Sequence, residues 1–196
     1  MKSLVTGANG FVGSAVARCL LEAGHEVRCL VRAGSDQSNL KGLPVEISEG
    51  DLRDVASLKR AVTNCENLFH VAADYRLWVP DPETMYEINV KGTQELILAA
   101  SGADVSRIIY TSSVATLGIN LDGNPADENT PSSLNNMTGH YKRSKFLAEQ
   151  VVQHLTDKHQ LPLVIVNPST PVGPRDVKPT PTGQIVLDTL CGRMPA

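Results

Sequence analysis

The sequence has no excess of basic residues and no long apolar run, and each absence excludes a class of protein. Its 18 Lys and Arg residues are outnumbered by 21 Asp and Glu residues, so it lacks the broad positive field typical of nucleic-acid and acidic-membrane binding. No apolar run approaches the roughly 18 residues of a membrane span. The chain also becomes glycine-rich too soon after Met1 to contain a signal-peptide core. We therefore expect a cytoplasmic protein that binds no nucleic acid and has no membrane span.

Cysteine is also scarce, and the four cysteines lie far apart in the chain. None belongs to a C-x-x-C motif or has a histidine at metal-ligand spacing, so the sequence supports neither a metal site nor a disulfide framework. We predict no metal site and four reduced thiols, mostly packed in the interior, at Cys19, Cys29, Cys65 and Cys191.

The composition is that of a packed domain. Hydrophobic residues make up 41% of the 196 residues, which excludes a disordered or collagen-like chain. Continuously apolar runs predict strands at Lys2–Thr6, Glu26–Val31, Val45–Ile47, Asn67–Ala72, Arg107–Thr111 and Leu161–Val166. Helical spacing predicts helices at Phe11–Ala23, Asp51–Val62 with Asp54 as N-cap, Glu83–Ala100 and His140–His154. This alternation predicts a doubly wound parallel α/β sheet that is covered on both faces. The end of the chain is predicted to be loop because of Pro168, Pro171, Pro174, Pro179, Pro181 and Pro195.

A glycine-rich turn separates the first predicted strand from the first predicted helix. Gly7 permits a tight turn, Gly10 lets the backbone approach a pyrophosphate, and Gly13 lets the helix pack closely on the sheet. The helix N-terminus then offers free N–H groups and partial positive charge to the phosphates. In this strand–turn–helix context the spacing predicts dinucleotide binding rather than a purely structural turn.

The end of the second strand indicates which dinucleotide binds. An NAD site usually places Asp or Glu there for the ribose 2′-hydroxyl, but this chain has Arg32, with Ser35 nearby. A guanidinium suits the 2′-phosphate of NADP and cannot accept a hydrogen bond from a hydroxyl. The sequence therefore favours NADP. In the alternative interpretation NAD binds, Arg32 is a solvated loop charge, and Asp36 contacts the ribose.

A second motif is suited to proton transfer. Tyr141 and Lys145 lie one helical turn apart on one face. A tyrosine that acts near neutral pH needs its pKa lowered by about 3 units, or about 4 kcal/mol, to which a nearby ammonium and an oxidised nicotinamide can both contribute. Ser113, at the end of a buried strand, can hydrogen-bond a substrate oxygen. The Tyr–Lys spacing alone is typical of an exposed amphipathic helix, but with Ser113 and the dinucleotide turn it predicts catalysis.

Four longer stretches carry a resemblance to a known family, namely FHVAADYRLW at 69–78, YTSSVATLG at 110–118, GHYKRSKFLAE at 139–149 and NPSTPVGP at 167–174. On these motifs the chain resembles the extended short-chain dehydrogenases/reductases, the NAD-dependent epimerase/dehydratase superfamily. It is similar to the dihydroflavonol-reductase-like branch and most similar to hopanoid-associated sugar epimerases. The resemblance implies a Rossmann-type dinucleotide-binding domain at 1–175. At 176–196 it implies the start of a C-terminal substrate domain that is largely missing from this chain.

The resemblance also implies roles for individual residues. Tyr141 would exchange a proton with the substrate oxygen as hydride moves to or from the nicotinamide. Lys145 would bind the nicotinamide ribose and lower the Tyr141 pKa, while Ser113 would hold the reacting oxygen. Asn89 matches a structural asparagine behind the site. The implied cofactor-binding residues are Asp51 and Leu52 beside adenine, Ala72 and Ala73 over the phosphates and ribose, and Tyr141, Lys145 and Pro168 near the nicotinamide. They add to Arg32 at the 2′-phosphate and to the residues of the turn, Gly7, Gly10, Phe11, Val12 and Gly13.

Two departures from the family pattern affect the functional prediction. Leu117 and Val172 each precede a glycine where epimerases usually carry tyrosine, which favours the reductase branch. Relatives also continue well beyond this length, so we expect either the ordered part of a longer protein or a fragment that binds cofactor with little turnover.

The predicted function is NAD(P)-dependent oxidoreduction or epimerisation at a carbonyl or hydroxyl carbon of a small sugar-like or polycyclic substrate, with hopanoid metabolism as one setting. One alternative is a dihydroflavonol-4-reductase-like NADPH ketone reductase. Another, from a different class, is a non-catalytic dinucleotide-sensing scaffold on the same fold. The helices that contain Glu83 and Tyr141 form the dimer interface in many relatives, so we expect a homodimer.

Other polar residues have weaker patterns. Tyr75, Arg76 and Trp78 follow a predicted strand and either face the substrate or belong to an ordinary surface loop. His70 lies inside an apolar strand and is interpreted as a hydrogen-bonded core histidine. His140 directly precedes Tyr141 and is interpreted as a residue that positions the start of the helix.

Overall fold

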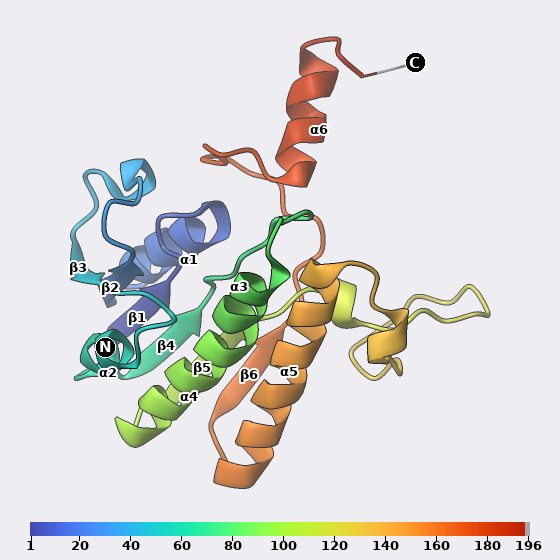
Figure 1. Ribbon diagram of the computed structural model, residues 1–196. Coiled ribbons are helices and arrows are strands. Elements are labelled where there is room, and N and C mark those ends of the chain that lie inside the picture. Colours follow the sequence, from blue (N-terminus) through green and yellow to red (C-terminus); the bar gives the residue numbers. More distant parts are fainter. Residues whose placement is uncertain (195–196) are drawn as a thin grey trace.

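The computed structural model describes residues 1–194 and contains a six-stranded sheet (Figure 1). All neighbouring strands pair in parallel, in the order β3-β2-β1-β4-β5-β6. The predicted doubly wound, Rossmann-type sheet is therefore confirmed, and its strand order changes direction between β1 and β4. The strands are β1 (Lys2–Thr6), β2 (Glu26–Val31), β3 (Val45–Glu49), β4 (Asn67–His70), β5 (Arg107–Thr111) and β6 (Leu163–Val166).

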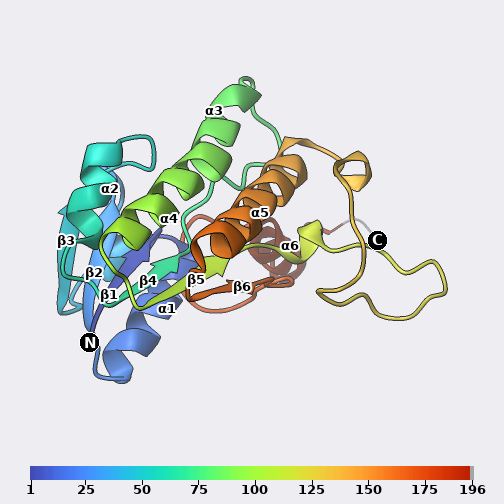
Figure 2. The ribbon, with the colours of Figure 1, turned by 90° about the horizontal axis from the view of Figure 1, so that it is seen from below.

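Helices cover both faces of the sheet. Figure 2 shows α1 on one face and α2, α4 and α5 on the other. Alternate residues of β1 point to opposite faces, so Val5 joins the buried cluster with Ala17 and Leu20 of α1, and Leu4 joins the larger cluster on the other face. The helices are α1 (Phe11–Glu22), α2 (Val55–Val62), α3 (Pro82–Tyr86), α4 (Thr93–Gly102), α5 (His140–His159) and α6 (Pro181–Leu190).

Two predicted elements differ in extent for identifiable reasons. β4 ends at His70, not Ala72, because Thr6 Oγ1 accepts hydrogen bonds from the N–H groups of Val71 and Ala72, each at 3.1 Å, in place of a strand partner. The predicted long helix from Glu83 is instead a helical run with a π-helical segment at Glu87–Gly92, between α3 and α4. The other predicted strands and helices are present, but α2 begins at Val55 rather than Asp51 and α5 continues to His159 rather than His154; the remaining ends shift by two residues or fewer.

The proline-rich end is not all loop, and that prediction was wrong for α6. Pro181 begins this helix because a proline at the first helical position gives up only an N–H that helices leave unpaired. Thr180 caps it by accepting a hydrogen bond from the Gly183 N–H at 3.1 Å. α6 projects away from the sheet (Figure 1) and contributes no buried residue. The loop prediction for Pro195 falls outside the described residues.

The burial of the cysteines agrees only in part with the sequence prediction. All four cysteines are free, but only Cys29 and Cys65 are buried, while Cys19 and Cys191 are exposed. The predicted packing role therefore holds for two of the four. Within residues 1–194, the helices are all too short or too polar to traverse a bilayer.

Candidate functional site

The predicted site residues follow the carboxyl ends of the strands, which lie at one edge of a parallel sheet. Gly7 follows β1, Arg32 follows β2, Asp51 follows β3, Ala72 and Ala73 follow β4, Ser113 follows β5 and Pro168 follows β6. The direction of the strand order changes beside β1, which is where open α/β sheets bind ligands. The fold thus brings residues from six separate segments to one edge of the sheet. We call it the cleft edge, because open α/β sheets bind ligands in the crevice outside the carboxyl ends of their strands.

The glycine turn has the geometry that its spacing predicts. Gly7 has a left-handed φ of +67°, and a Cβ there would lie 2.8 Å from the Ala72 Cα. A Cβ on Gly13 would lie 2.1 Å from the Gly7 carbonyl oxygen. The start of α1 can therefore pack this closely on the turn only because residue 13 has no side chain. Gly10 N donates a hydrogen bond to that same oxygen at 2.9 Å. The backbone of the turn therefore packs directly against the chain that leaves β4.

The first turn of α1 is open toward the cleft edge. Gly10 is the N-cap residue and no side chain caps the helix, so the N–H groups of Phe11, Val12 and Gly13 are not satisfied by a cap. A helix N-terminus of this kind binds anions such as phosphate. The ring of Phe11 lies 3.5 Å from where a Gly173 Cβ would be, so the loop after β6 passes over the turn.

A polar cavity of about 690 Å³ lies beyond the ends of β2 and β3. Arg53 donates two hydrogen bonds to the Asp51 carboxylate, each at 2.9 Å. These bonds, with a further contribution from the charge of Arg32, hold the Asp51 pKa below its usual range. The cavity-lining residues are Arg32, Ala33, Gly34, Ser35, Glu49, Gly50, Asp51, Arg53, Asp54 and Arg60.

Two residues that the sequence analysis considered as cofactor contacts, Leu52 and Asp36, have side chains that are already engaged within the protein. The side chain of Leu52 is buried in the main core and packs against Gly92 of the π-helical segment, so only its backbone remains available to a ligand. Asp36, the alternative ribose partner, accepts a hydrogen bond from the Ser38 N–H at 2.8 Å. Its carboxylate therefore already closes a local turn.

Ser113 and Tyr141 come together although 28 positions separate them in the sequence. Ser113 caps a short 3₁₀ helix at Val114–Thr116, where its Oγ accepts a hydrogen bond from Ala115 N at 3.1 Å. Burial raises the pKa of Tyr141, and a hydrogen bond with the Ser113 side chain opposes that rise. The pKa therefore shifts upward in this structure, and the lowering that catalysis needs stays a prediction for the cofactor-bound protein.

Lys145 is almost completely buried, with 3% of its surface exposed. Its Nζ donates hydrogen bonds to the Tyr110 hydroxyl at 3.0 Å and to the Thr111 carbonyl at 2.8 Å. Desolvation lowers the pKa of Lys145 to about 7. Lys145 is thus held at the end of β5 by two partners that the sequence analysis did not identify. Of these two partners, only Tyr110 could have been suspected from the sequence, because it is a residue with a polar hydroxyl within an apolar strand.

His70 is the hydrogen-bonded core histidine that the sequence predicted. Its Nδ1 pairs with Thr6 Oγ1 at 2.8 Å and its Nε2 with Thr93 Oγ1 at 2.9 Å. Burial, together with the charge of Lys145, lowers the pKa of His70 to about 3, so the ring is neutral near pH 7. The same Thr6 hydroxyl accepts hydrogen bonds from Val71 and Ala72, so this buried chain of hydrogen bonds supports the backbone next to the glycine turn.

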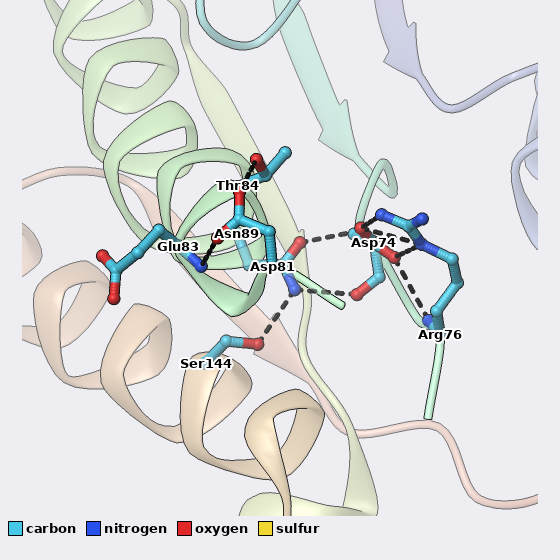
Figure 3. Close-up of polar contacts among 7 residues, drawn as sticks. All are labelled: Asp74, Arg76, Asp81, Glu83, Thr84, Asn89 and Ser144. Atoms are coloured by element: carbon cyan, nitrogen blue, oxygen red, sulfur yellow. Dashed lines mark hydrogen bonds and ion pairs between the residues drawn. The ribbon is translucent and has the colours of Figure 1, made fainter. Parts of the chain in front are cut away.

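Asn89 connects the loop after β4 to α5, as Figure 3 shows. Its Nδ2 donates to the Asp74 carbonyl at 2.8 Å and to Ser144 Oγ at 2.9 Å, and its Oδ1 accepts from Asp74 N at 2.7 Å. Ser144 directly precedes Lys145. The implied structural role of Asn89 therefore has a physical basis, since a single amide ties the two segments that flank the cleft edge.

The remaining candidates lie at the margin of the site. Tyr75 and Trp78 are exposed, at 46% and 79%, and Arg76 pairs with Asp74 of its own loop. The ring of His140 contacts the Tyr86 hydroxyl through Nδ1 at 3.1 Å, which joins the start of α5 to α3. Pro168 lies beside the Ser113 loop because its carbonyl accepts a hydrogen bond from Val114 N at 3.1 Å. Among residues 1–194, no group of three His, Cys, Asp or Glu side chains is placed to hold a metal ion.

Comparisons with known proteins match this geometry. A protein of Synechocystis sp. (strain ATCC 27184 / PCC 6803 / Kazusa), provisionally named dihydroflavonol 4-reductase, is 48% identical over 98% of this chain and 55% of its own length. The crystal structure of gox2253 is 60% identical, with a TM-score of 0.94, over 98% of this chain and 58% of that one. The structure of Thermus thermophilus UDP-glucose 4-epimerase in complex with NAD is 25% identical, with a TM-score of 0.82, over 95% of this chain and 61% of that one.

The chain thus spans somewhat more than half the length of these relatives. The family model described as "NAD dependent epimerase/dehydratase family" matches residues 3–193. This match includes the glycine turn, the Ser113 loop and the first turns of α5. The chain belongs to the NAD dependent epimerase/dehydratase family, within the extended short-chain dehydrogenases/reductases.

Proposed function

We propose that the chain is the nucleotide-binding and proton-transferring part of an NADP-dependent oxidoreductase or epimerase. The observation that carries the proposal is the joint placement of Ser113, Tyr141 and Lys145 at the edge of the sheet that also holds the glycine turn. Residues 1–175 would bind the dinucleotide and supply the catalytic groups, and residues 176–196 would begin the substrate-binding region.

The residues around the turn suit a dinucleotide. Side chains at Gly7 or Gly13 would collide with backbone, so close backbone packing is preserved there, and the uncapped α1 terminus supplies donors for a pyrophosphate. We assign Gly7, Gly10, Phe11, Val12 and Gly13 to that pyrophosphate. Asp51 and the Leu52 backbone would then flank adenine, Ala72 and Ala73 the phosphates and ribose, and Pro168 the nicotinamide end.

We assign a separate role to each of the three reactive side chains. A bound nicotinamide would donate or accept hydride at the substrate carbon. Tyr141 would donate or accept the proton at the substrate oxygen, and Ser113 would hydrogen-bond that oxygen. Lys145 would turn its buried amine from Tyr110 and Thr111 toward the nicotinamide ribose, and its charge would lower the Tyr141 pKa.

NADP is the proposed form of the cofactor. Arg32, Ser35, Arg53 and Arg60 line the cavity of about 690 Å³, and guanidinium groups bind a phosphate in a bidentate manner. The Thermus relative is described in complex with NAD, so NAD is the alternative cofactor. Equal affinity for NADH and NADPH would contradict the assignment of Arg32 to a 2′-phosphate.

The proposed substrate is a small sugar-like or polycyclic molecule with a reactive carbonyl or hydroxyl carbon. Leu117 and Val172 replace the tyrosines that epimerases usually carry, which favours net reduction in the manner of dihydroflavonol reductases. A hopanoid-related substrate stays a prediction from the resemblance, as do the homodimer and the cytoplasmic location.

Two measurements test the proposal. Fluorescence titration of the chain with NADPH and NADH should show binding of NADPH in the micromolar range or tighter, and Gly13→Val should abolish it because the new side chain would occupy the Gly7 carbonyl position. A screen of ketones and sugars should then find a substrate that either consumes NADPH in equal amount, as a reductase does, or turns over without net NADPH loss, as an epimerase does. A folded chain that binds neither nucleotide would overturn the proposal.

A further inference from the structure

The carboxylate of Glu149 is a junction of three hydrogen-bond donors. Its Oε2 accepts from Ser112 Oγ, from Thr116 Oγ1 at 2.9 Å and from Asn167 Nδ2 at 3.1 Å. These donors belong to three segments, the residue after β5, the 3₁₀ helix at Val114–Thr116, and the residue after β6. Glu149 itself lies on α5, so one oxygen joins four parts of the cleft edge. Hydrogen bonds to an ionised oxygen are about twice as strong as those between neutral groups.

The junction extends directly to Ser113. Thr116 Oγ1 is also within hydrogen-bond distance of the Ser113 carbonyl, at 2.8 Å, and Asn167 Nδ2 lies 3.1 Å from the same oxygen. The single hydroxyl proton of Thr116 is therefore shared between Glu149 and the Ser113 carbonyl. The two amide protons of Asn167 are shared among these two oxygens and Thr116 Oγ1. The position of the Ser113 loop relative to α5 is thus set by the groups that converge on Glu149.

Glu149 also shares a helix face with Tyr141 and Lys145. Tyr141, Lys145 and Glu149 lie at successive four-residue steps on α5, which places them on one side of the helix. The negative charge of Glu149 raises the pKa of Lys145, against the desolvation that lowers it to about 7. The carboxylate therefore opposes the loss of the Lys145 charge near neutral pH.

Few other titratable groups face Lys145 among the described residues. Tyr110 contacts its amine from β5, and His70 interacts with its charge from β4. Tyr141 lies one turn earlier on α5, and the groups that β6 and the 3₁₀ helix present at the junction, Asn167 and Thr116, are neutral. His70 is neutral across the range in which Lys145 titrates, which leaves Glu149 as the negative charge on this side.

We propose that Glu149 is a positioning residue for the reaction: its carboxylate joins the ends of β5 and β6 to α5, orients Ser113, and places a negative charge on the face of α5 that carries Lys145. This inference rests on the proposed function only for the use made of Ser113 and Lys145. The junction needs both an acceptor and a negative charge, and these two properties are separable by substitution. Glu149→Gln retains a carbonyl acceptor and removes the charge, whereas Thr116→Val removes one donor and leaves the charge.

The test is the titration of Lys145 in the full chain labelled with ¹³C-lysine, with its NMR signal assigned through Lys145→Arg. We expect Glu149→Gln to raise the acid dissociation constant of Lys145 about tenfold. The matched control, Asp157→Asn, removes an exposed carboxylate from the same helix and should leave the titration unchanged. An unchanged titration in folded Glu149→Gln, or an equal shift in the control, would overturn the role of the charge.

Thr116→Val tests whether the junction orients Ser113, and it does so even if Glu149→Gln fails to fold. We expect amide hydrogen exchange at Val114 and Ala115 to accelerate about tenfold or more, because local opening becomes easier when a support is lost, while the Lys145 titration stays as in the wild type. Unchanged exchange at both amides would overturn the orienting role. NADPH titration of the wild type separates the two proposals, since absence of binding contradicts the proposed function without altering the Lys145 result.

Discussion

Both ends of the cleft edge contain titratable side chains, but these side chains are exposed at one end and buried at the other. Beside β2 and β3, charged groups face solvent: Arg53 and Asp51 form an ion pair whose side chains are 48% and 27% exposed. Beside β4 and β5, Lys145 and His70 are buried, with exposures of 3% and 1%, and are hydrogen-bonded on several sides. Exposed pairs contribute about 0–1 kcal/mol to stability, whereas an unmatched buried polar group is strongly unfavourable. Under the proposed function, the exposed end would adjust cofactor affinity, and the buried end would determine the chemistry and contribute more to folding.

The largest expected effect is on turnover at the buried end. Tyr141→Phe removes the proposed proton donor, so the rate on the substrate found by the screen should fall by a factor of about 10² to 10⁴, with NADPH affinity nearly unchanged. Thr156→Val removes a hydroxyl that hydrogen-bonds to the Val152 carbonyl in the second half of the same helix; it is the control and should retain the wild-type rate. If Tyr141→Phe leaves the output of the protein unchanged, the enzyme hypothesis fails and the sensor alternative gains support.

The next effect is acid destabilisation through His70. Its pKa is about 3 in the folded protein and about 6.5 ordinarily, so the unfolded chain binds more protons between these values and stability decreases as the pH falls through that window. Between pH 6.5 and 4.5 we expect this group to remove about 2–3 kcal/mol. Urea unfolding should show a flatter pH dependence for His70→Gln than for the wild type. His25→Gln, at a partly buried histidine of the opposite edge, is the comparison variant, and equal slopes for wild type and His70→Gln would contradict the expectation.

At the exposed end, the expected effect is on cofactor choice. Arg32→Ala should weaken NADPH binding about 10- to 100-fold, since a hydrogen bond to a charged group contributes about 1.5–3 kcal/mol, and should change NADH binding much less. Thermal unfolding without nucleotide should stay close to that of the wild type. Lys41→Ala, at an exposed lysine of the segment between β2 and β3 that does not line the cavity, should bind both nucleotides normally. A parallel loss of NADPH and NADH affinity would show that the exposed end does not discriminate the 2′-phosphate.

The smallest expected effect concerns the Asp51–Arg53 pair. Arg53→Ala should lower the free energy of unfolding by less than about 1 kcal/mol, and this difference should shrink further in high salt because the pair is partly exposed. Paired urea titrations at low and high ionic strength measure it. A loss comparable with that of the buried substitutions would remove the contrast between the two ends.

Much of the fold and part of the site were predictable from local sequence. β1, β2 and β5 have the predicted bounds, and Asp54 caps α2 as expected, with its side chain accepting from Ala56 and Ser57. The glycine turn was equally predictable because the requirement at Gly7 is a local backbone conformation. The prediction of a loop over Pro181 failed because proline prevents a helix only in its interior, not at its start.

The roles of buried polar groups required the tertiary structure. The sequence presented Lys145 as a partner of Tyr141, but its amine hydrogen-bonds to Tyr110 and Thr111 from another strand. Glu149 resembled one more charge on a helix, yet its donors come from segments up to 37 positions away. No local pattern encodes such distances.

The sequence alone determined the alternation of strands and helices, the parallel sheet and the conformation of the glycine turn. These features depend on the spacing of apolar residues and on glycine backbone conformation, which act within a few residues. What only the tertiary structure decided is which side chain each buried polar group contacts. In a low-dielectric interior every donor needs an acceptor, and that acceptor is supplied by whichever segment the sheet places alongside.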